Sequence, residues 1–171
     1  ANMDGISLSL DGAPPTQDRQ RPLSSGSGSS EHVMRTIAAL DEHRIDYGIR
    51  LTATAPWTLA DDIRYLCEHT NCQSFQAEPA FNIKRGGHYE PDEDEIQGFV
   101  SAYLNAFEVA SEFKRRLHYS GARIGTVTQT FCSAPYDALV VNADGKIVAC
   151  YEVASETHPL APLSEIGRIE N

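Results

Sequence analysis

One candidate site is a polar segment that directly follows an expected strand near the N-terminus. Residues 6–10 alternate apolar and polar side chains, which is typical of a half-buried strand, and an Asp-Gly turn follows at 11–12. If this strand belongs to a parallel sheet, its carboxyl end faces a ligand crevice. Ser9 could then bond a ribose or similar hydroxyl, and Arg21 could pair with Asp18 or with a carboxylate. The alternative is an ordinary turn followed by a solvated arginine loop.

A pair of cysteines forms the second candidate site. Twelve residues separate Cys132 from Gly145, and four more separate Gly145 from Cys150. The Asp-Gly turn at 144–145 predicts a β-hairpin that folds Cys150 back toward the segment with Cys132. Two thiolates placed this way could hold half of an iron–sulfur cluster or part of a zinc site, with the other ligands supplied from outside the chain. The alternative is two small buried apolar residues on a hairpin.

Arg50 is a charged residue inside an expected strand at 47–54 whose other residues near it are apolar or small. A charge in a nearly buried strand needs a partner. That partner is either a carboxylate such as Glu78 or the carboxylate of a ligand. Cys67 and Cys72 lie, respectively, on the apolar stripe of an expected helix and just before a strand, so we predict core or near-surface thiols.

The elements that would position these residues alternate between strand and helix. Strands are expected at 6–10, 47–54 and 74–80, helices at 30–43 and 58–69, and a long loop at 13–30. The longest helix is expected after Pro91 and closes at 114–116. Its predicted buried face consists of Ile96, Phe99, Val100, Tyr103, Phe107 and Ala110. The alternation predicts an α/β fold of parallel βα units at 1–117, followed by a small β-hairpin element at 118–171.

Composition excludes several classes of partner. The chain has 171 residues, 41% of them hydrophobic, with 14 Lys and Arg against 24 Asp and Glu, so its formal net charge is −10. This charge argues against a nucleic acid or an anionic membrane as the partner. The sequence contains no apolar run long enough to cross a bilayer and no signal peptide, so we expect a cytoplasmic protein. The absence of a leader or first βα unit before the strand at 6–10 suggests a piece of a longer protein.

Considered together, the two candidate sites resemble radical S-adenosylmethionine enzymes with a C-terminal SPASM domain, a group that includes sulfatase and peptide maturases. Ser9-Leu10-Asp11-Gly12, with Asp18 and Arg21, resembles the fourth strand and following loop of their partial (β/α)6 barrel. The segments 47–54 and 74–79 resemble the fifth and sixth strands, and 132–150 resembles the opening of the SPASM cysteine pattern. The resemblance runs collinearly over most of the chain.

The resemblance implies a role for four residues. Ser9 would contact the ribose of S-adenosylmethionine (AdoMet), and Arg50 is a candidate for its carboxylate. Cys132 and Cys150 would be ligands of an auxiliary 4Fe–4S cluster. In the family, AdoMet is cleaved to a 5′-deoxyadenosyl radical that abstracts hydrogen from a peptide or protein substrate.

The chain also departs from the family pattern. It contains no Cys-x-x-x-Cys-x-x-Cys, so the ligands of the catalytic cluster are missing and we expect the isolated chain to be inactive. Tyr151 and Glu152 follow Cys150 where sulfatase maturases have an Asp, which favours a maturase of another type.

We also expect self-association through an exposed strand edge at 6–10. Two other functions stay open. One is a non-enzymatic module that binds a peptide or small ligand, and the other is a small zinc protein.

Overall fold

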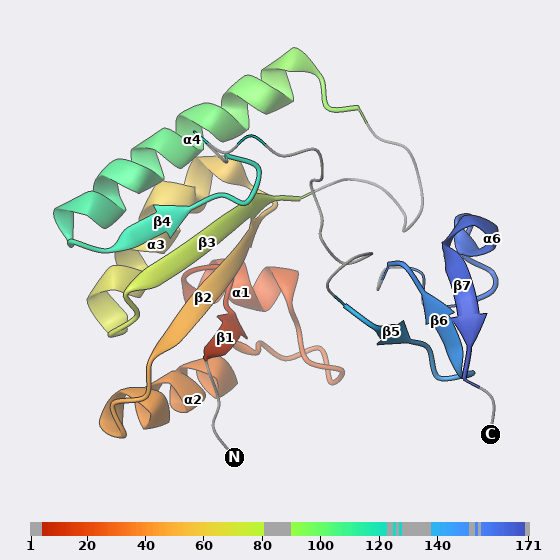
Figure 1. Ribbon diagram of the computed structural model, residues 1–171. Coiled ribbons are helices and arrows are strands. Elements are labelled where there is room, and N and C mark those ends of the chain that lie inside the picture. The colour runs from red at the N-terminus through yellow and green to blue at the C-terminus, as the bar shows by residue number, and fades with distance from the viewer. Residues whose placement is uncertain are drawn as a thin grey trace. The chain divides into compact units, whose positions relative to one another are not determined.

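The computed structural model describes residues 5–80, 90–122, 125, 127, 138–150, 153 and 155–169, and these fall into two compact units. The first unit contains a parallel sheet with the strand order β1-β2-β3-β4 (Figure 1). Its strands are β1 Ile6–Ser9, β2 Tyr47–Ala53, β3 Ser74–Pro79 and β4 Arg116–His118. The second unit contains a separate antiparallel sheet in the order β5-β6-β7. The predicted α/β class, with parallel βα units and a hairpin element, is confirmed.

The helices of the first unit connect its parallel strands. They are α1 Pro14–Gln20, α2 Ser30–Glu42, the short 3-10 helix η1 Pro56–Thr58, α3 Leu59–His69 and α4 Glu93–Glu112. Of these, α2, α3 and α4 are the three that the sequence predicts. The start of α4 is fixed by a capping box. The Asp92 side chain accepts from the Glu95 N–H at 2.8 Å, and the Glu95 side chain accepts from the Asp92 N–H at 3.1 Å.

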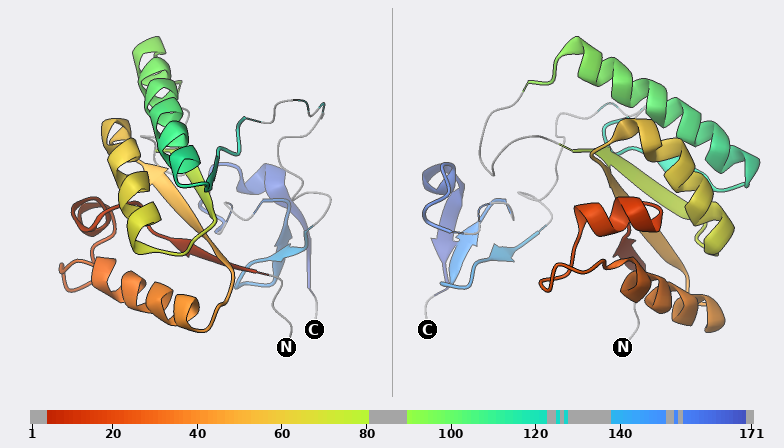
Figure 2. Two further views of the ribbon diagram at one scale, coloured as in Figure 1. Left: turned by 90° about the vertical axis from the view of Figure 1, so that its left-hand side faces the viewer. Right: turned by 180° about the vertical axis from the view of Figure 1, so that it is seen from behind.

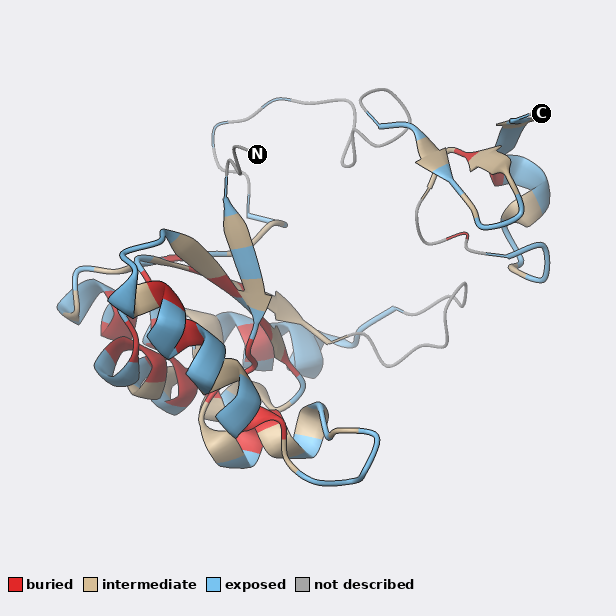
Figure 3. Cartoon of the chain, turned by 90° about the horizontal axis from the view of Figure 1, so that it is seen from below, coloured by how far each residue is buried: buried red, intermediate tan, exposed pale blue. Residues whose placement is uncertain are grey.

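The core of the first unit lies between one face of the sheet and helices α2, α3 and α4, which all pack on that face (Figure 2). The strand residues that point into it alternate with exposed ones, so the buried positions concentrate where the helices meet the sheet (Figure 3). The most deeply buried members are Leu10, Ile37, Ile49, Leu51, Ile63, Leu66 and Phe75.

The opposite face of the sheet carries polar side chains instead. Ser9, Arg50 and His118 are exposed on it, and Gln76 is half-buried. Parallel sheets are normally covered on both faces by apolar contacts. In the part of the chain that the structure describes, helices cover one face, so the expectation that Arg50 lies in a nearly buried strand is wrong. We call this polar surface the open face.

Two local predictions fail at helix ends. The segment 13–30 is not all loop, because α1 starts at Pro14, where a proline loses no helical hydrogen bond. The longest helix ends at Glu112, before the basic run expected to close it. Lys114, with a φ of 58°, stops it, and the Arg115 N–H donates to the Ala110 carbonyl at 2.8 Å. The helix therefore ends, and the chain continues into β4.

The buried face of α4 is narrower than the sequence predicts. Phe99 and Ala110 are buried as expected, but Ile96, Val100 and Phe107 are 41%, 42% and 47% exposed. The fully covered stripe consists of Phe99, Ala106, Val109 and Ala110, and Tyr103 is partly buried against the core. Periodicity cannot tell how wide a stripe the neighbouring elements will cover.

The second unit confirms the predicted hairpin and adds a third strand. β5 Val140–Val141 pairs with β6 Lys146–Val148 across the turn, where Gly145 has a φ of 80°. β7 Glu165–Arg168, which follows the short helix α6 Ala161–Ser164, pairs with the other edge of β6.

β1 is an edge strand whose partner among the described residues is β2. Self-association through its outer edge stays a prediction.

Candidate functional site

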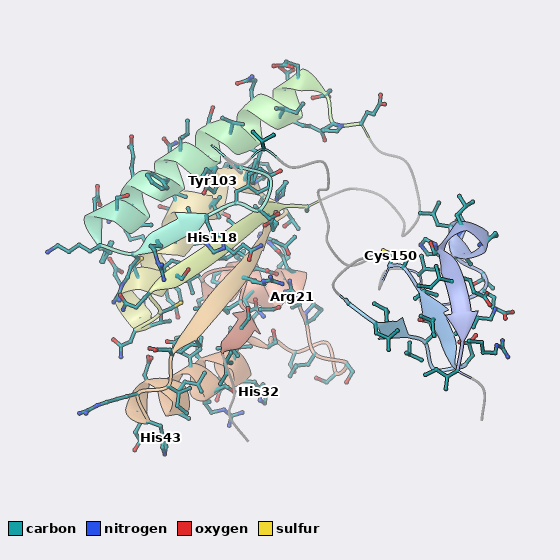
Figure 4. The ribbon with its side chains drawn as sticks, viewed as in Figure 1. Arg21, His32, His43, Tyr103, His118 and Cys150 are labelled. Carbon is teal, nitrogen blue, oxygen red and sulfur yellow. The ribbon has the colours of Figure 1, made fainter. Side chains whose placement is uncertain are left out.

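The open face holds a row of four side chains in register across the sheet. Ser9 is opposite Arg50, Arg50 is opposite Gln76, and Gln76 is opposite His118. Adjacent strands lie about 4.8 Å apart, so Ser9 and Arg50 are immediate neighbours although they are distant in the sequence. The structure therefore brings together the two residues that the sequence suggested for binding a cofactor. Figure 4 marks His118 on β4, at the far end of this row.

Arg50 is held by an amide, and not by a carboxylate. Its Nε donates to Gln76 Oε1 at 3.2 Å, and Gln76 Nε2 donates in turn to Glu78 Oε1 at 2.7 Å. Glu78 also accepts from the N–H and the hydroxyl of Ser120, at 3.0 and 2.9 Å. The terminal nitrogens of Arg50 have no hydrogen-bond partner among the described residues. Of the two partners considered for Arg50, Glu78 is thus excluded, and a ligand carboxylate stays open.

Asp11 is the centre of a hydrogen-bond network at the carboxyl end of β1. Its side chain is 1% exposed and accepts from Arg21 Nε at 2.7 Å and Arg21 Nη2 at 3.1 Å. It also accepts from the backbone N–H of Thr52 at 2.8 Å. Of the two partners predicted for Arg21 (Figure 4), Asp18 is wrong and a carboxylate is confirmed, since Arg21, just after the last residue of α1, pairs with Asp11 at the end of β1. The network ties β1 to β2 beside Ser9 and Arg50.

Two glutamines of α1 complete this network. Gln17 Oε1 accepts from the Asp11 N–H at 2.8 Å, and its Nε2 donates to Ser29 Oγ at 2.9 Å. Gln20, with its amide oriented to satisfy both of its polar ends, donates to the Thr52 carbonyl and to Asp11 Oδ2 at 3.0 and 3.1 Å. Sequence reasoning missed both residues because it left this segment as loop. The Pro-Pro pair that starts α1 is the signal that could have revealed them.

Gly12 passes very close to Asp62, the buried carboxylate near the start of α3. A Cβ at Gly12 would lie 2.2 Å from Asp62 Cγ, and Gly12 has a φ of 148°. Asp62 accepts from the Ala13 N–H at 2.9 Å and from the hydroxyls of Thr16 and Thr58 at 3.2 and 2.7 Å. These contacts fix the loop after β1 against α3 and so determine where α1 begins.

Asp18 anchors the start of α2. Its carboxylate accepts from the backbone N–H of Ser30 at 2.7 Å and from the Ser30 hydroxyl at 3.0 Å, and these bonds lower its pKa below the ordinary value. A carboxyl whose pKa is lowered in the folded state stabilises the fold above its unfolded pKa, and that contribution is lost as the pH falls through the folded pKa.

We therefore expect Asp18→Asn to be less stable than the wild type at pH 7, with the difference narrowing below about pH 4, the ordinary pKa of aspartate. Urea unfolding at pH 7 and pH 3 measures this, with Asp46→Asn as the control. A difference that stays constant between the two pH values would contradict the assignment.

The cysteines divide between the described and the undescribed parts of the chain. Cys150 is a half-buried free thiol, whereas Cys132 lies outside the described residues, as do Tyr151 and Glu152. Their pairing in a metal site stays a prediction. The described residues contain no group of three or more His, Cys, Asp or Glu side chains that could hold a metal ion.

Cys67 and Cys72 are buried, as predicted, and burial raises the pKa of both thiols.

In the described part of the chain, no helix has the length and apolarity that a membrane span requires.

Comparison with known proteins gives a match at the level of structure. No protein-family model and no curated protein matches the chain. Two structures of the radical SAM enzyme anSMEcpe with bound AdoMet, one carrying a histidine tag and one native, give TM-scores of 0.71 and 0.69 at 13% and 14% sequence identity. Each match covers 96% of this chain. This chain in turn spans 45% of the tagged anSMEcpe chain and 47% of the native one.

A third match is a crystal structure of SuiB from Streptococcus suis, also a radical SAM enzyme. The TM-score is 0.57 at 10% sequence identity. The match covers 90% of this chain and 39% of the SuiB chain. The chain thus spans less than half the length of these three structures, and over that span its fold is similar to theirs.

Proposed function

We propose that this chain is the part of a radical SAM maturase that supplies one side of the AdoMet site and the start of a SPASM-like auxiliary-cluster domain. The observation that carries the proposal is the cross-strand pair of Ser9 and Arg50, exposed side by side on the open face of a sheet with the radical SAM fold. The AdoMet bound in two structural neighbours supports the choice of cofactor.

The open face offers suitable partners for the polar ends of AdoMet. The hydroxyl of Ser9 would bond the ribose, and the free terminal nitrogens of Arg50 would bind the carboxylate in a charge-assisted contact. When bound and cleaved by one electron from a 4Fe–4S cluster held outside this chain, AdoMet would supply methionine and a 5′-deoxyadenosyl radical for hydrogen abstraction from a peptide or protein. Asp11 and Arg21 position the pair by joining the ends of β1 and β2.

The auxiliary-cluster part of the proposal rests on the sequence. Cys132 and Cys150 would be two ligands of a 4Fe–4S cluster, with the others outside this chain. We propose a peptide maturase of a type other than the sulfatase maturases, because Tyr151 and Glu152 replace the Asp of that pattern. The acidic composition argues against a nucleic acid as the substrate, and we propose a peptide or protein in its place. A cytoplasmic location stays a prediction.

The first test is the coding sequence on both sides of this segment, together with AdoMet binding by the full gene product. We expect an upstream Cys-x-x-x-Cys-x-x-Cys and further cysteines downstream. Arg50→Gln should weaken AdoMet binding by roughly 10-fold or more, the effect of one charge-assisted hydrogen bond, and Ser9→Ala should weaken it less. Ser101→Ala on α4 is the control.

A gene product without the cluster motif, or AdoMet affinity that is the same in Arg50→Gln and the control, would overturn the proposal. A non-enzymatic module that binds a peptide or small ligand on the open face would then explain the exposed polar row. The isolated chain, which lacks the cluster motif, should form no 5′-deoxyadenosine in either case.

A further inference from the structure

Two basic side chains stand on β4, at the edge of the open face far from Ser9. Arg116 and His118 are both exposed, and Leu117 between them is 4% exposed and belongs to the core. Because side chains alternate along a strand, Arg116 and His118 project on the same face. Neither side chain has a hydrogen bond or an ion pair within the part of the chain that the structure describes.

A groove of about 580 Å³ reaches Arg116 at the amino ends of the strands. Gly48, Ser74 and Arg116 line it and stand in register across β2, β3 and β4. Gly48 has no side chain to fill the groove at its position in this row. A Cβ there would have only the Ser74 carbonyl oxygen within 4 Å, at 3.6 Å. Arg116 therefore borders both the groove and the part of the open face that holds His118.

The charges of this region favour an anionic ligand. Glu78, two residues after Gln76 on β3, already accepts from Gln76 and Ser120. In the groove, Asp41 accepts from the Tyr47 hydroxyl at 2.7 Å and from a backbone N–H. The other acid that lines the groove, Asp46, is matched there by a second base, Arg44. Arg116 supplies a permanent positive charge and His118 a ring N–H, and neither side chain has a partner among the described residues, so both are available to a carboxylate.

We propose that Arg116 and His118 bind a carboxylate side chain of the substrate, and that this substrate is an extended acidic peptide. The proposal rests on the proposed maturase function. Gln76 separates His118 from Arg50, so His118 is two strands, or about 10 Å, from the residue assigned to the AdoMet carboxylate. The two anionic groups would thus occupy separate positions on one face.

The outer edge of β4 supports a peptide as the source of the carboxylate. β4 has β3 as its partner, and no described strand pairs with its other edge. An extended peptide can add to such an edge by backbone hydrogen bonds, while alternate side chains are read by the face of the sheet. Arg116 and His118 would read an acidic side chain in that arrangement.

The test is an NMR titration of the 171-residue chain with the pentapeptide acetyl-Ala-Ala-Glu-Ala-Ala-amide and with its Gln analogue. We expect saturable shifts at residues 74–76 and 116–118, with the Gln peptide at least 10-fold weaker. Arg116→Gln and His118→Gln should each weaken the Glu peptide at least 5-fold. Lys114→Gln, which removes one positive charge just outside β4, should stay within 2-fold of the wild type.

Each alternative outcome is decisive. Equal affinity for the Glu and Gln peptides, or equal loss in Arg116→Gln and Lys114→Gln, overturns the carboxylate site. If acetyl-Glu-amide alone binds as tightly as the pentapeptide, the edge of β4 adds nothing and the peptide substrate is wrong. The folded state of each variant is checked from the dispersion of its amide spectrum, and a Gly48→Leu variant, which fills the groove without changing charge, should also weaken the pentapeptide.

A second titration separates this inference from the proposed function. In the full gene product, Arg116→Gln should leave AdoMet affinity unchanged, and Arg50→Gln should weaken AdoMet binding while leaving the Glu peptide bound. If AdoMet does not bind but the Glu peptide does, the maturase proposal fails and the carboxylate site stands. If AdoMet binds and the Glu peptide does not, the inference alone is wrong.

Discussion

Asp11→Asn should lower the free energy of unfolding by about 3 kcal/mol, the cost of breaking a buried ion pair from one side. The Asp11 carboxylate is 1% exposed, and the substitution removes the negative charge that binds Arg21. It also places an amide NH₂, which is itself a donor, beside the donors of Arg21 and the Thr52 N–H. Arg21 is 42% exposed and regains water, which keeps the loss at the lower end of the range for buried pairs.

Urea unfolding of Asp11→Asn, Arg21→Gln and the double variant measures this loss and the coupling between the two residues. Arg21→Gln alone should cost less, because Asp11 keeps its bond from the Thr52 N–H. Asp61→Asn, an exposed carboxylate on α3, is the control and should change stability by less than about 0.5 kcal/mol. Equal stability of Asp11→Asn and Asp61→Asn would contradict the central role of Asp11.

Gly12→Ala should destabilise the chain by roughly 3 kcal/mol or more, because two costs combine at this position. Its φ of 148° is one that residues with a Cβ rarely adopt, and the new Cβ would lie 2.2 Å from Asp62 Cγ. Asp62 cannot move away without losing its bonds to the Ala13 N–H and to the Thr16 and Thr58 hydroxyls.

Gly26→Ala separates these two costs. Gly26 has a φ of 84° but nothing within 4 Å of its added Cβ, so its substitution costs backbone strain alone, about 1 kcal/mol. Thermal and urea unfolding of the two variants should therefore differ by about 2 kcal/mol. If they are equally destabilised, steric contact with Asp62 does not define this loop.

Both substitutions act on the site as well as on stability. Asp11 joins the ends of β1 and β2, and Gly12 sets the path of the chain into α1, which carries Arg21. Ser9 and Arg50 lie on these two strands in direct register. A variant that loosens the strand ends should thus disturb the position of both side chains without touching either of them.

The sequence by itself determined the local elements and their order. The strands at Ile6–Ser9, Tyr47–Ala53 and Ser74–Pro79 and the helices α2 and α3 between them follow from alternating and helical periodicity, which depend on residues close in the chain. The short helix α1 and the strand β4 were not predicted. The same is true of the hairpin at Gly145, where a φ of 80° suits glycine. Local patterns were enough to predict the fold class.

Only the tertiary structure decided which polar groups meet. Asp11 was a turn residue in the sequence, and its partners are Arg21, directly after α1, and Thr52 on β2. Arg50 was expected to be nearly buried, but its face of the sheet is open, and it bonds to Gln76 and not to Glu78. Sequence periodicity shows that a residue faces one side of a strand, but what covers that side depends on elements packed from elsewhere. Arg116 and His118 likewise share one face of the assembled sheet and find no partner among the described residues. The inferred carboxylate site depends on both of these features, and neither can be read from the sequence.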